Sequence, residues 1–242
     1  MVIGIFDVGF VAIFSCHILR GRTSKYGIVD LMKNIKAIGF DVDGTLYHTP
    51  DAMSVEVGKI LITKAAEALS KDPDDLAEEY LKRRDEYWSN TQTLNSFGLD
   101  GERIFQEVWD SIAVEKYVAK DMRLAKMITQ LKKKYKLFIV TNGSGHQVER
   151  KMTHLGLDYH DFDPRIYCYD QGWVKPEPAP FLAAMESLDM KPEEIVYVGD
   201  RVDVDIEGAS AVGMKTIFIG GESGKADLCV AEIYGLSDIF LP

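Results

Sequence analysis

Two carboxylates stand two residues apart near the start of the chain, directly after a short apolar run. Asp41 and Asp43 follow Ile38-Gly39-Phe40, and Gly44 and Thr45 come next. An apolar run of this kind predicts a buried parallel strand, and open α/β sheets bind their ligands at the carboxyl ends of such strands. Two like charges at a buried strand end are costly unless a cation lies nearby. The pair could therefore supply a nucleophile and an acid/base, provided that a metal or a positively charged side chain holds them together.

Three later segments place polar side chains where such partners are needed. In chain order they are Thr141 with Asn142 after the apolar residues 138–140, Lys175 before a proline, and Asp200 after the apolar residues 195–199, with Asp203 and Asp205 just beyond. Each piece alone has a plain structural explanation, since Asp at a strand end often caps a helix and Thr often lies in a turn. Together and in this order they predict one site at the carboxyl edge of a parallel sheet.

The chain resembles the haloacid dehalogenase superfamily of aspartate-nucleophile phosphotransferases over residues 35–219. Its four motifs match Asp-x-Asp-Gly-Thr at Asp41–Thr45, Thr141, Lys175, and Gly-Asp-x-x-x-x-Asp at Gly199–Asp205. The resemblance implies an α/β fold with a Rossmann-like parallel sheet in the order 3-2-1-4-5 and helices on both faces. It also implies a helical cap inserted between the first and second motifs. It is specific for the superfamily and much less so for a substrate.

The resemblance further implies an Mg²⁺-dependent phosphatase that hydrolyses a small phosphate monoester through an aspartyl-phosphate intermediate on Asp41. Asp43 would act as general acid and base, and its backbone carbonyl would join Asp41 and Asp200 as a metal ligand. Asp205 would orient metal-bound water or the catalytic lysine without touching the metal itself. Mg²⁺ suits this role because it prefers oxygen ligands and usually takes one or two carboxylates together with substrate phosphate.

The phosphate group itself would be bound by Thr141, Asn142 and Lys175. Phosphoryl transfer depends mostly on positioning and electrostatic stabilisation, because negative charge concentrates on the transferred group. Thr141 and Lys175 would thus be catalytic as well as phosphate-binding. Asp203 lies between the two aspartates of the last motif in sequence, and we expect it to stay outside the metal's ligand set.

Other functions remain open at this point. A phosphomutase would use the same aspartates and shield the aspartyl phosphate from water, and a non-catalytic module would use the phosphate site only for sensing. A dehalogenase is disfavoured because those relatives lack the carboxylate that Asp43 provides. We expect the partner to be a small phosphorylated metabolite, namely a sugar phosphate, phosphoglycolate or a nucleoside monophosphate.

Composition sets the limits of this interpretation. The chain has 242 residues, of which 46% are hydrophobic and 27% charged, as in a globular enzyme with one sizeable core and an inserted subdomain. Its formal charge of −10 argues against nucleic acid and anionic membranes as partners. The three cysteines lack the paired spacing of a disulfide framework or a zinc site. We expect a cytoplasmic protein that is a monomer or a homodimer.

Strand and helix patterns alternate through most of the chain and predict the domain boundaries. The catalytic core would comprise residues 32–49 and 121–242, and the helical cap residues 50–120. Core strands are expected at residues 35–40, 137–140, 166–169, 195–198 and 216–219, and core helices at 122–135, 147–155, 179–188 and 205–212. In the cap, helical patterns cover residues 55–69, 74–88 and 102–114, and the polar stretch 89–96 is expected to be a loop connecting two of them. That loop either faces the catalytic aspartates or is exposed, and we favour the second.

Residues 1–31 do not fit the superfamily pattern. The stretch 2–19 is almost wholly apolar, but Asp7 interrupts it and its positive charges follow it, whereas a secretory signal has them first. We favour an N-terminal extension over a membrane anchor.

Overall fold

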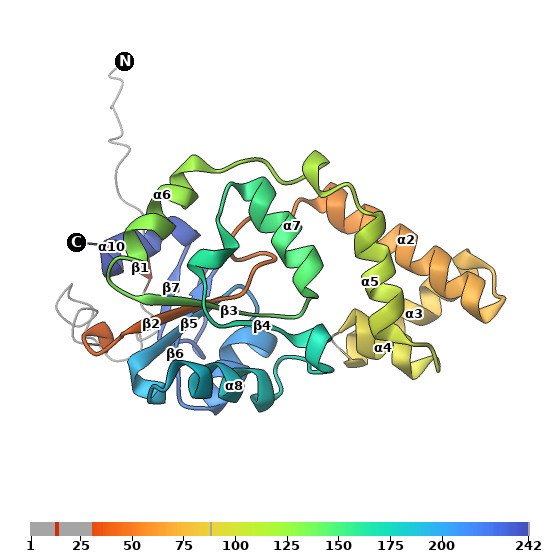
Figure 1. Ribbon diagram of the computed structural model, residues 1–242. Coiled ribbons are helices and arrows are strands. Elements are labelled where there is room, and N and C mark those ends of the chain that lie inside the picture. The colour runs from red at the N-terminus through yellow and green to blue at the C-terminus, as the bar shows by residue number, and fades with distance from the viewer. Residues whose placement is uncertain (1–12, 15–30, 88, 242) are drawn as a thin grey trace, which may run out of the picture.

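The computed structural model describes residues 13–14, 31–87 and 89–241, and its centre is a seven-stranded sheet (Figure 1). The spatial order of the strands is β1-β7-β6-β5-β2-β3-β4. Their bounds are β1 Ile13–Phe14, β2 Ala37–Phe40, β3 Lys136–Thr141, β4 Arg165–Tyr167, β5 Ile195–Gly199, β6 Lys215–Ile219 and β7 Leu228–Val230. All neighbours from β7 to β4 are parallel, and only β1 pairs antiparallel, with β7. The predicted five-strand order is confirmed, and β7 extends it by a sixth parallel strand.

Helices cover both faces of this sheet, as predicted (Figure 1). On one face α6 (Met122–Leu131), α7 (Gly145–Leu155) and α10 (Leu236–Phe240) contribute buried side chains to the same core cluster as Ile38 and Phe40 of β2. On the other face α8 (Pro178–Leu188) and α9 (Glu207–Ala211) pack against β3 and β5. Strands β2 and β5 are buried along their whole length, which explains why they read as continuous apolar runs rather than alternating ones.

The helical cap lies to one side of the sheet and is inserted between β2 and β3 (Figure 1). Its helices are α2 (Asp51–Leu69), α3 (Pro73–Tyr87), α4 (Asn90–Ser96) and α5 (Gly101–Ser111). The insertion of a helical cap at this point of the chain is confirmed. No helix of the described residues combines the length and the apolar character that crossing a bilayer requires.

The expectation of a loop over residues 89–96 is wrong, because this stretch forms α4. The Ser89 hydroxyl accepts a hydrogen bond from the Gln92 N–H at 3.5 Å and so caps the helix. Thr91, Thr93 and Leu94 are buried in the cap. The polar composition hid a helix whose buried face is built mainly from threonine rather than from large apolar residues.

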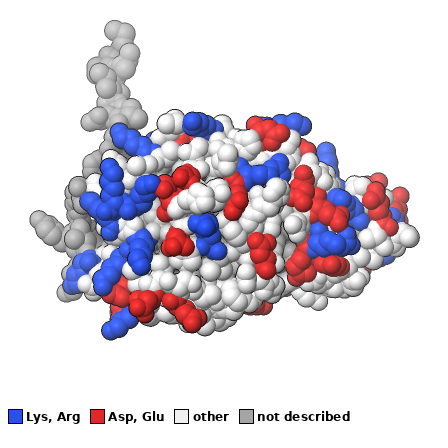
Figure 2. Space-filling model, in the orientation of Figure 1, with Lys and Arg blue, Asp and Glu red and all other residues white. Residues whose placement is uncertain are grey.

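Some element ends also differ from the prediction. The helix expected from residue 122 to 135 ends at Leu131, and the one expected from residue 205 begins earlier, with a π-helical turn over Val202–Ile206 that leads into α9. The predicted extension, residues 1–31, lies outside the described residues apart from β1 and Leu31. Acidic and basic side chains both occur over the core and over the cap on the face shown in Figure 2.

Candidate active site

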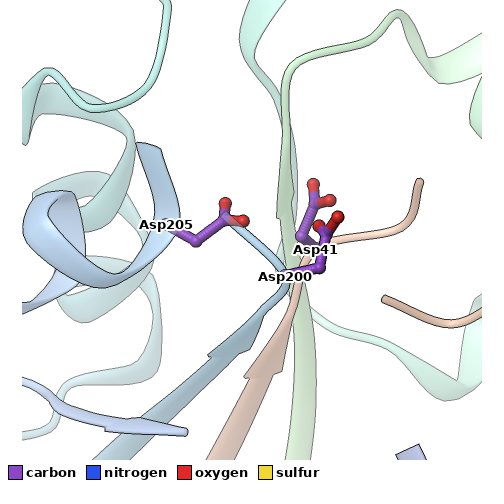
Figure 3. Close-up of side chains that lie close together, drawn as sticks. All are labelled: Asp41, Asp200 and Asp205. Carbon is purple, nitrogen blue, oxygen red and sulfur yellow. The ribbon is translucent and has the colours of Figure 1, made fainter. Parts of the chain in front are cut away.

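The parallel register brings the predicted carboxylates to one edge of the sheet (Figure 3). Phe40 of β2 is aligned with Val198 of β5, so that Asp41 and Asp200 follow neighbouring strand ends. Asp205 reaches the same place from the π-helical turn, and oxygens of the three carboxylates lie within 4.8 Å of one another. Asp41 is only 7% exposed and Asp205 only 1%.

Gly44 lets the loop after β2 lie against Asp200. Its φ of +86° is in the left-handed region, and a Cβ atom there would come within 2.1 Å of Asp200 Oδ2. The next residue, Thr45, donates from its hydroxyl to Asp200 Oδ1 at 3.3 Å. The Gly-Thr part of the first motif thus shapes the contact between two strand ends.

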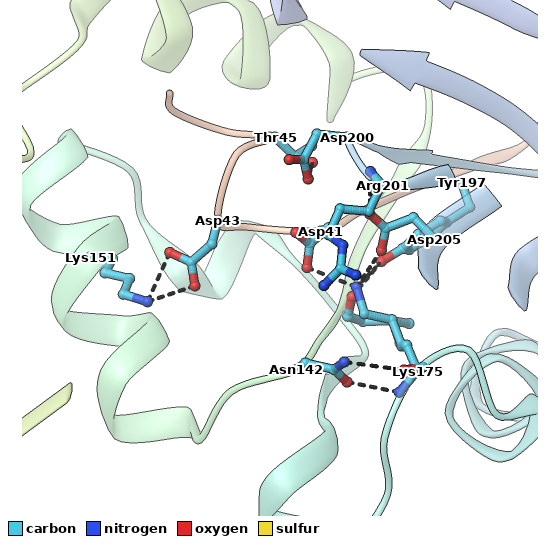
Figure 4. A network of polar contacts seen from close by, with 11 residues as sticks. Asp41, Asp43, Thr45, Asn142, Lys151, Lys175, Tyr197, Asp200, Arg201 and Asp205 are labelled. Carbon is cyan, nitrogen blue, oxygen red and sulfur yellow. Dashed lines mark hydrogen bonds and ion pairs between the residues drawn. The ribbon is translucent and has the colours of Figure 1, made fainter. Parts of the chain in front are cut away.

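Lys175 lies buried between two of the carboxylates (Figure 4). Its Nζ atom is 2.8 Å from Asp41 Oδ1 and 2.6 Å from Asp205 Oδ1, and it also donates to the Tyr197 hydroxyl at 3.0 Å. Burial disfavours its charge, but the carboxylates of Asp205 and Asp41 overcome this effect and raise the pKa of Lys175 well above its usual range. The side chain is therefore a permanent ammonium group.

Asn142 fixes the backbone of this lysine. Its Oδ1 atom accepts from the Lys175 N–H at 2.8 Å, and its Nδ2 donates to the Lys175 carbonyl at 3.3 Å. Thr141, the last residue of β3, is buried and lines the same cavity as Asp41 and Lys175.

Asp43 points away from this group, toward α7 (Figure 4). Lys151 of α7 donates to both of its carboxylate oxygens, at 2.8 and 2.7 Å, and the Tyr47 hydroxyl donates to one of them. Lys151 is only 2% exposed, and its ammonium lies 3.6 Å from the centre of the Trp109 ring in the cap. The two aspartates of the first motif thus have separate lysine partners.

Burial and mutual repulsion raise the pKa values of two carboxyl groups at the strand ends. Burial raises the pKa of Asp41 to about 6 although Lys175 opposes the shift, and Asp205 adds to it. Burial also raises the pKa of Asp200 to about 7, with Asp41 and Asp205 contributing. One ammonium is shared among several carboxylates, so the site has an excess of negative charge.

This excess fits a hard divalent cation between Asp41 and Asp200. Asp205 is already engaged at both oxygens, by Lys175 at Oδ1 and by the Arg201 N–H at Oδ2, at 3.0 Å. The carboxylates of Asp41 and Asp200 are less committed, and oxygen ligands of this kind suit Mg²⁺. The π-helical turn, whose wider spacing is common at functional sites, aims Asp205 at Lys175.

The strand ends open into a cavity of about 740 Å³ between core and cap. Its core wall includes Asp41, Asp43, Thr141, Asn142 and Lys175, and its cap wall Arg84, Ser89, Asn90, Gln92, Phe105 and Trp109. A second cavity, of about 790 Å³, lies beyond the loop after β2; Asp43 and Asp200 reach it, but Asp41, Thr141 and Lys175 do not. The first cavity therefore brings together the predicted site residues other than Asp200, which lines the second.

Lys151, Tyr47 and Trp109 were not among the predicted site residues. Lys151 occupies a buried position of α7, in phase with Val148 and Leu155, and a lysine on the apolar face of a helix needs a countercharge. That position was the available signal. His48 lines the second cavity and not the first, and Asp203 forms an ion pair with Arg201 at 2.7 Å.

The sequence is similar to known phosphatases along most of its length. A model of the haloacid dehalogenase-like hydrolase family matches residues 35–213. Glyceraldehyde 3-phosphate phosphatase of Methanopyrus kandleri is 35% identical over 201 residues, which cover 76% of this chain and 84% of the relative. N-acylneuraminate-9-phosphatase of Mus musculus is 27% identical over 217 residues, which cover 81% of this chain and 87% of the relative.

Solved structures agree with this relationship. A haloacid dehalogenase phosphatase from Thermococcus onnurineus superposes with a TM-score of 0.61 at 29% identity, over 85% of this chain and 97% of its own. A magnesium-bound haloacid dehalogenase hydrolase from Bacillus subtilis shares the fold with a TM-score of 0.59 at 20% identity, over 86% and 99% of the two chains. The chain belongs to the haloacid dehalogenase-like hydrolase family and is a phosphoric monoester hydrolase.

Proposed function

We propose that this phosphatase hydrolyses its monoester through an aspartyl-phosphate on Asp41, with Asp43 as general acid and base. The observation that carries this proposal is the asymmetric environment of Asp41. Lys175 holds Oδ1 of this carboxylate, whereas no hydrogen-bond donor of the described chain binds Oδ2. One oxygen is thus fixed by a permanent cation, and the other is available for attack on phosphorus at the wall of the cavity.

In the first step Asp41 attacks phosphorus, the bond to the leaving oxygen breaks, and Asp43 gives that oxygen a proton. In the second step Asp43 takes a proton from water as the water attacks phosphorus and the bond to Asp41 breaks. Lys175 and Thr141 stabilise negative charge on the phosphoryl oxygens throughout. A bound Mg²⁺ would offset the repulsion between the carboxylates and the phosphate.

Asp43 has to leave Lys151 to reach the leaving oxygen. Its side chain is 29% exposed and borders the cavity, so rotation about its side-chain bonds meets open space. We infer that Lys151 holds this carboxylate in place between the proton transfers. For Asn142, which the sequence suggested as a phosphate ligand, we propose a different role: its side chain positions Lys175.

The names of the relatives support a small phosphorylated metabolite as substrate, since they act on glyceraldehyde 3-phosphate and on an N-acylneuraminate 9-phosphate. Both are monoesters of compounds with carbonyl or carboxyl groups. A cavity of about 740 Å³ has room for molecules of this size range.

The test is a screen of the purified protein with Mg²⁺ against a panel of phosphate monoesters, with Asp41→Asn and Asp43→Asn in parallel. Phosphate release should vanish with EDTA and with Asp41→Asn. Asp43→Asn should lose roughly 10²–10⁴-fold in rate while it still binds Mg²⁺.

Equal phosphate release by wild type and Asp41→Asn would rule out the nucleophile. Product analysis by NMR separates the alternatives: a phosphomutase would isomerise the substrate without releasing phosphate. A sensing module would bind it without any turnover.

A further inference from the structure

The cavity wall contains four positively charged side chains, and three of them are paired with carboxylates of the same wall. Lys175 is bound to Asp41 and Asp205, Arg201 to Asp203, and Lys225 to Glu207. The fourth is Arg84 in α3. Within the described residues it forms no ion pair with any carboxylate.

Arg84 is held in a defined orientation although it lacks a countercharge. Its Nε–H donates to Asn90 Oδ1 at 3.1 Å, and the hydroxyl of the buried Tyr80 donates to the same oxygen at 3.0 Å. This arrangement leaves the two terminal nitrogens of the guanidinium without a hydrogen-bond acceptor among the described residues. Terminal guanidinium nitrogens bind carboxylate or phosphate oxygens in pairs.

The surroundings of Arg84 disfavour its charge in the absence of an anion. Burial and the nearby guanidinium of Arg201 lower its pKa, in that order of size, and the smaller opposing effects of Tyr80, Asp203 and Asp85 do not offset them. Glu86 also borders the cavity, but it is exposed and makes no ion pair with Arg84. Ser89, Asn90 and Gln92, the other polar side chains of this cap wall, are uncharged.

The cavity therefore has two differently charged ends. At the core end, Asp41, Thr141 and Lys175 are proposed to act on the phosphate, whereas the cap end presents the half-buried Arg84 with neutral polar groups, and its one carboxylate, Glu86, is exposed. An aldehyde or a hydroxyl group would leave this cation unpaired in a partly desolvated place. A carboxylate or a second phosphate would pair with it.

We propose that Arg84 binds a second anionic group of the substrate, so that the preferred monoesters are dianionic phosphates that carry a carboxylate or another phosphate at their far end. This inference rests on the proposed function for the position of the reacting phosphate. It favours phosphorylated acids and bisphosphates over phosphorylated aldehydes and alcohols of the same size.

The experiment measures binding rather than turnover, so that it does not depend on catalysis. In the Asp41→Asn background with Mg²⁺, calorimetry gives the Kd of two matched pairs of probes. The carboxylate pair is 3-phosphoglycerate and glycerol 3-phosphate, and the bisphosphate pair is ribulose 1,5-bisphosphate and ribulose 5-phosphate. At least one anionic probe should bind about 10-fold or more tightly than its neutral match, as expected for charge-assisted hydrogen bonds.

Adding Arg84→Gln should reduce that preference to about twofold or less, and Arg84→Lys should keep part of it. Glutamine can still donate to Asn90, so the local structure is preserved. Lys82→Gln is the matched control, because Lys82 is an exposed lysine on the same helix that pairs with Glu78 at 2.8 Å; it should leave both Kd ratios unchanged.

Two results would overturn the inference: no preference for either anionic probe, or a preference that survives Arg84→Gln. The probe pair whose Kd ratio falls with Arg84→Gln shows whether Arg84 binds a carboxylate or a phosphate. The proposed function is judged separately, by phosphate release from wild type against Asp41→Asn. Either idea can therefore fail while the other stands.

Discussion

The contact between Lys151 and Asp43 joins the proposed acid/base to a buried lysine 108 residues away in the chain. A buried ammonium is costly unless it is paired, and here the pair also meets the face of Trp109. Core, loop and cap therefore meet at one charged contact. If Asp43 transfers protons, Lys151 sets the position of its carboxylate between the two transfers.

We predict that Lys151→Met lowers kcat by about 10- to 100-fold while KM changes by less than about threefold. The reason is that proton transfer depends on the position of Asp43, whereas phosphate binding depends on Lys175 and Thr141. Lys151→Arg should recover part of the rate because it restores the charge. Steady-state kinetics with the best monoester of the panel measures both parameters.

The matched control is Lys126→Met on the exposed side of α6, which should behave as wild type. A wild-type kcat for Lys151→Met would show that the contact is structural only. A large rise in KM would place Lys151 in substrate binding instead.

Three of the motif residues could be predicted from the sequence because each stands at the end of an apolar run, where the strand pattern itself fixes its position. Asp41, Thr141 and Asp200 are of this kind. Arg84 could not be predicted, because it lies inside a helix, where only tertiary packing decides which side chains reach the cavity. For Lys151 the apolar phase of its helix signalled the need for a countercharge, but not that Asp43 supplies it. For Asn142 the pattern predicted its position at the site. It did not predict that the side chain binds the backbone of Lys175.

Among the elements, the parallel strands β2 and β5 bring together the carboxyl groups of Asp41 and Asp200, which repel each other when both are ionised. The pKa values of Asp41 and Asp200 are raised to about 6 and about 7 in the fold, against 3.8 for each in the unfolded chain. The folded state thus binds more protons than the unfolded one between about pH 4 and pH 7. These groups stabilise the metal-free fold below pH 3.8, and this contribution is lost as the pH rises through 6 and 7.

We therefore predict that Mg²⁺ raises the Tm more at pH 8 than at pH 5. At pH 8 both carboxylates are ionised and repel each other until a cation binds, whereas at pH 5 the cation has to displace protons. Differential scanning fluorimetry with Mg²⁺ and with EDTA at the two pH values measures the difference.

Asp200→Asn tests whether the rise in Tm with Mg²⁺ comes from the site between Asp41 and Asp200. In EDTA at pH 8 it should be more stable than wild type by roughly 2 kcal/mol, or several degrees in Tm, because it removes one buried charge. Its response to Mg²⁺ should be small at both pH values. An equal Mg²⁺ response of wild type at pH 5 and pH 8 would contradict the proposed ligands.

The elements of the core were easier to predict than those of the cap. Alternating apolar strands and amphipathic helices predicted a parallel sheet with right-handed crossovers, and the resemblance to the superfamily supplied the strand order. Strand β7 was missed because it has only three residues, and α4 because its buried face consists mainly of threonines. Short elements of this kind depend on tertiary contacts rather than on local pattern.

In the whole molecule, the 740 Å³ cavity forms where the cap packs against the core. Two polar contacts from α7 help to fix this arrangement: Gln147 donates to the Gln106 carbonyl at 3.2 Å, and Arg150 to the Ile112 carbonyl at 3.1 Å. Both acceptors are backbone groups, which no side-chain pattern reveals. The presence of a cap could therefore be predicted from the sequence, but not the residues that it presents to the site.

We propose that residues 1–31 are an extension outside the catalytic core. Among the residues that the structure describes, those that line the 740 Å³ cavity fall between Asp41 and Lys225, and the family match begins at residue 35. A protein that starts at Met32 should therefore keep kcat/KM within about twofold of the full chain. Because it lacks β1, a strand of two residues whose partner in the described part of the chain is β7, its Tm should fall by no more than a few degrees.

Side-by-side kinetics and thermal unfolding of the two proteins provide the measurement. A shortened protein that unfolds cooperatively but has lost most of its activity would assign residues 1–31 a part in the site. A shortened protein that fails to fold would show that residues 1–31 belong to the core. The loss of β1 alone could not explain such a failure, because a short antiparallel pair at a sheet edge contributes too little to the stability of a chain of 242 residues. Only the retention of both fold and rate agrees with a core that begins near residue 32.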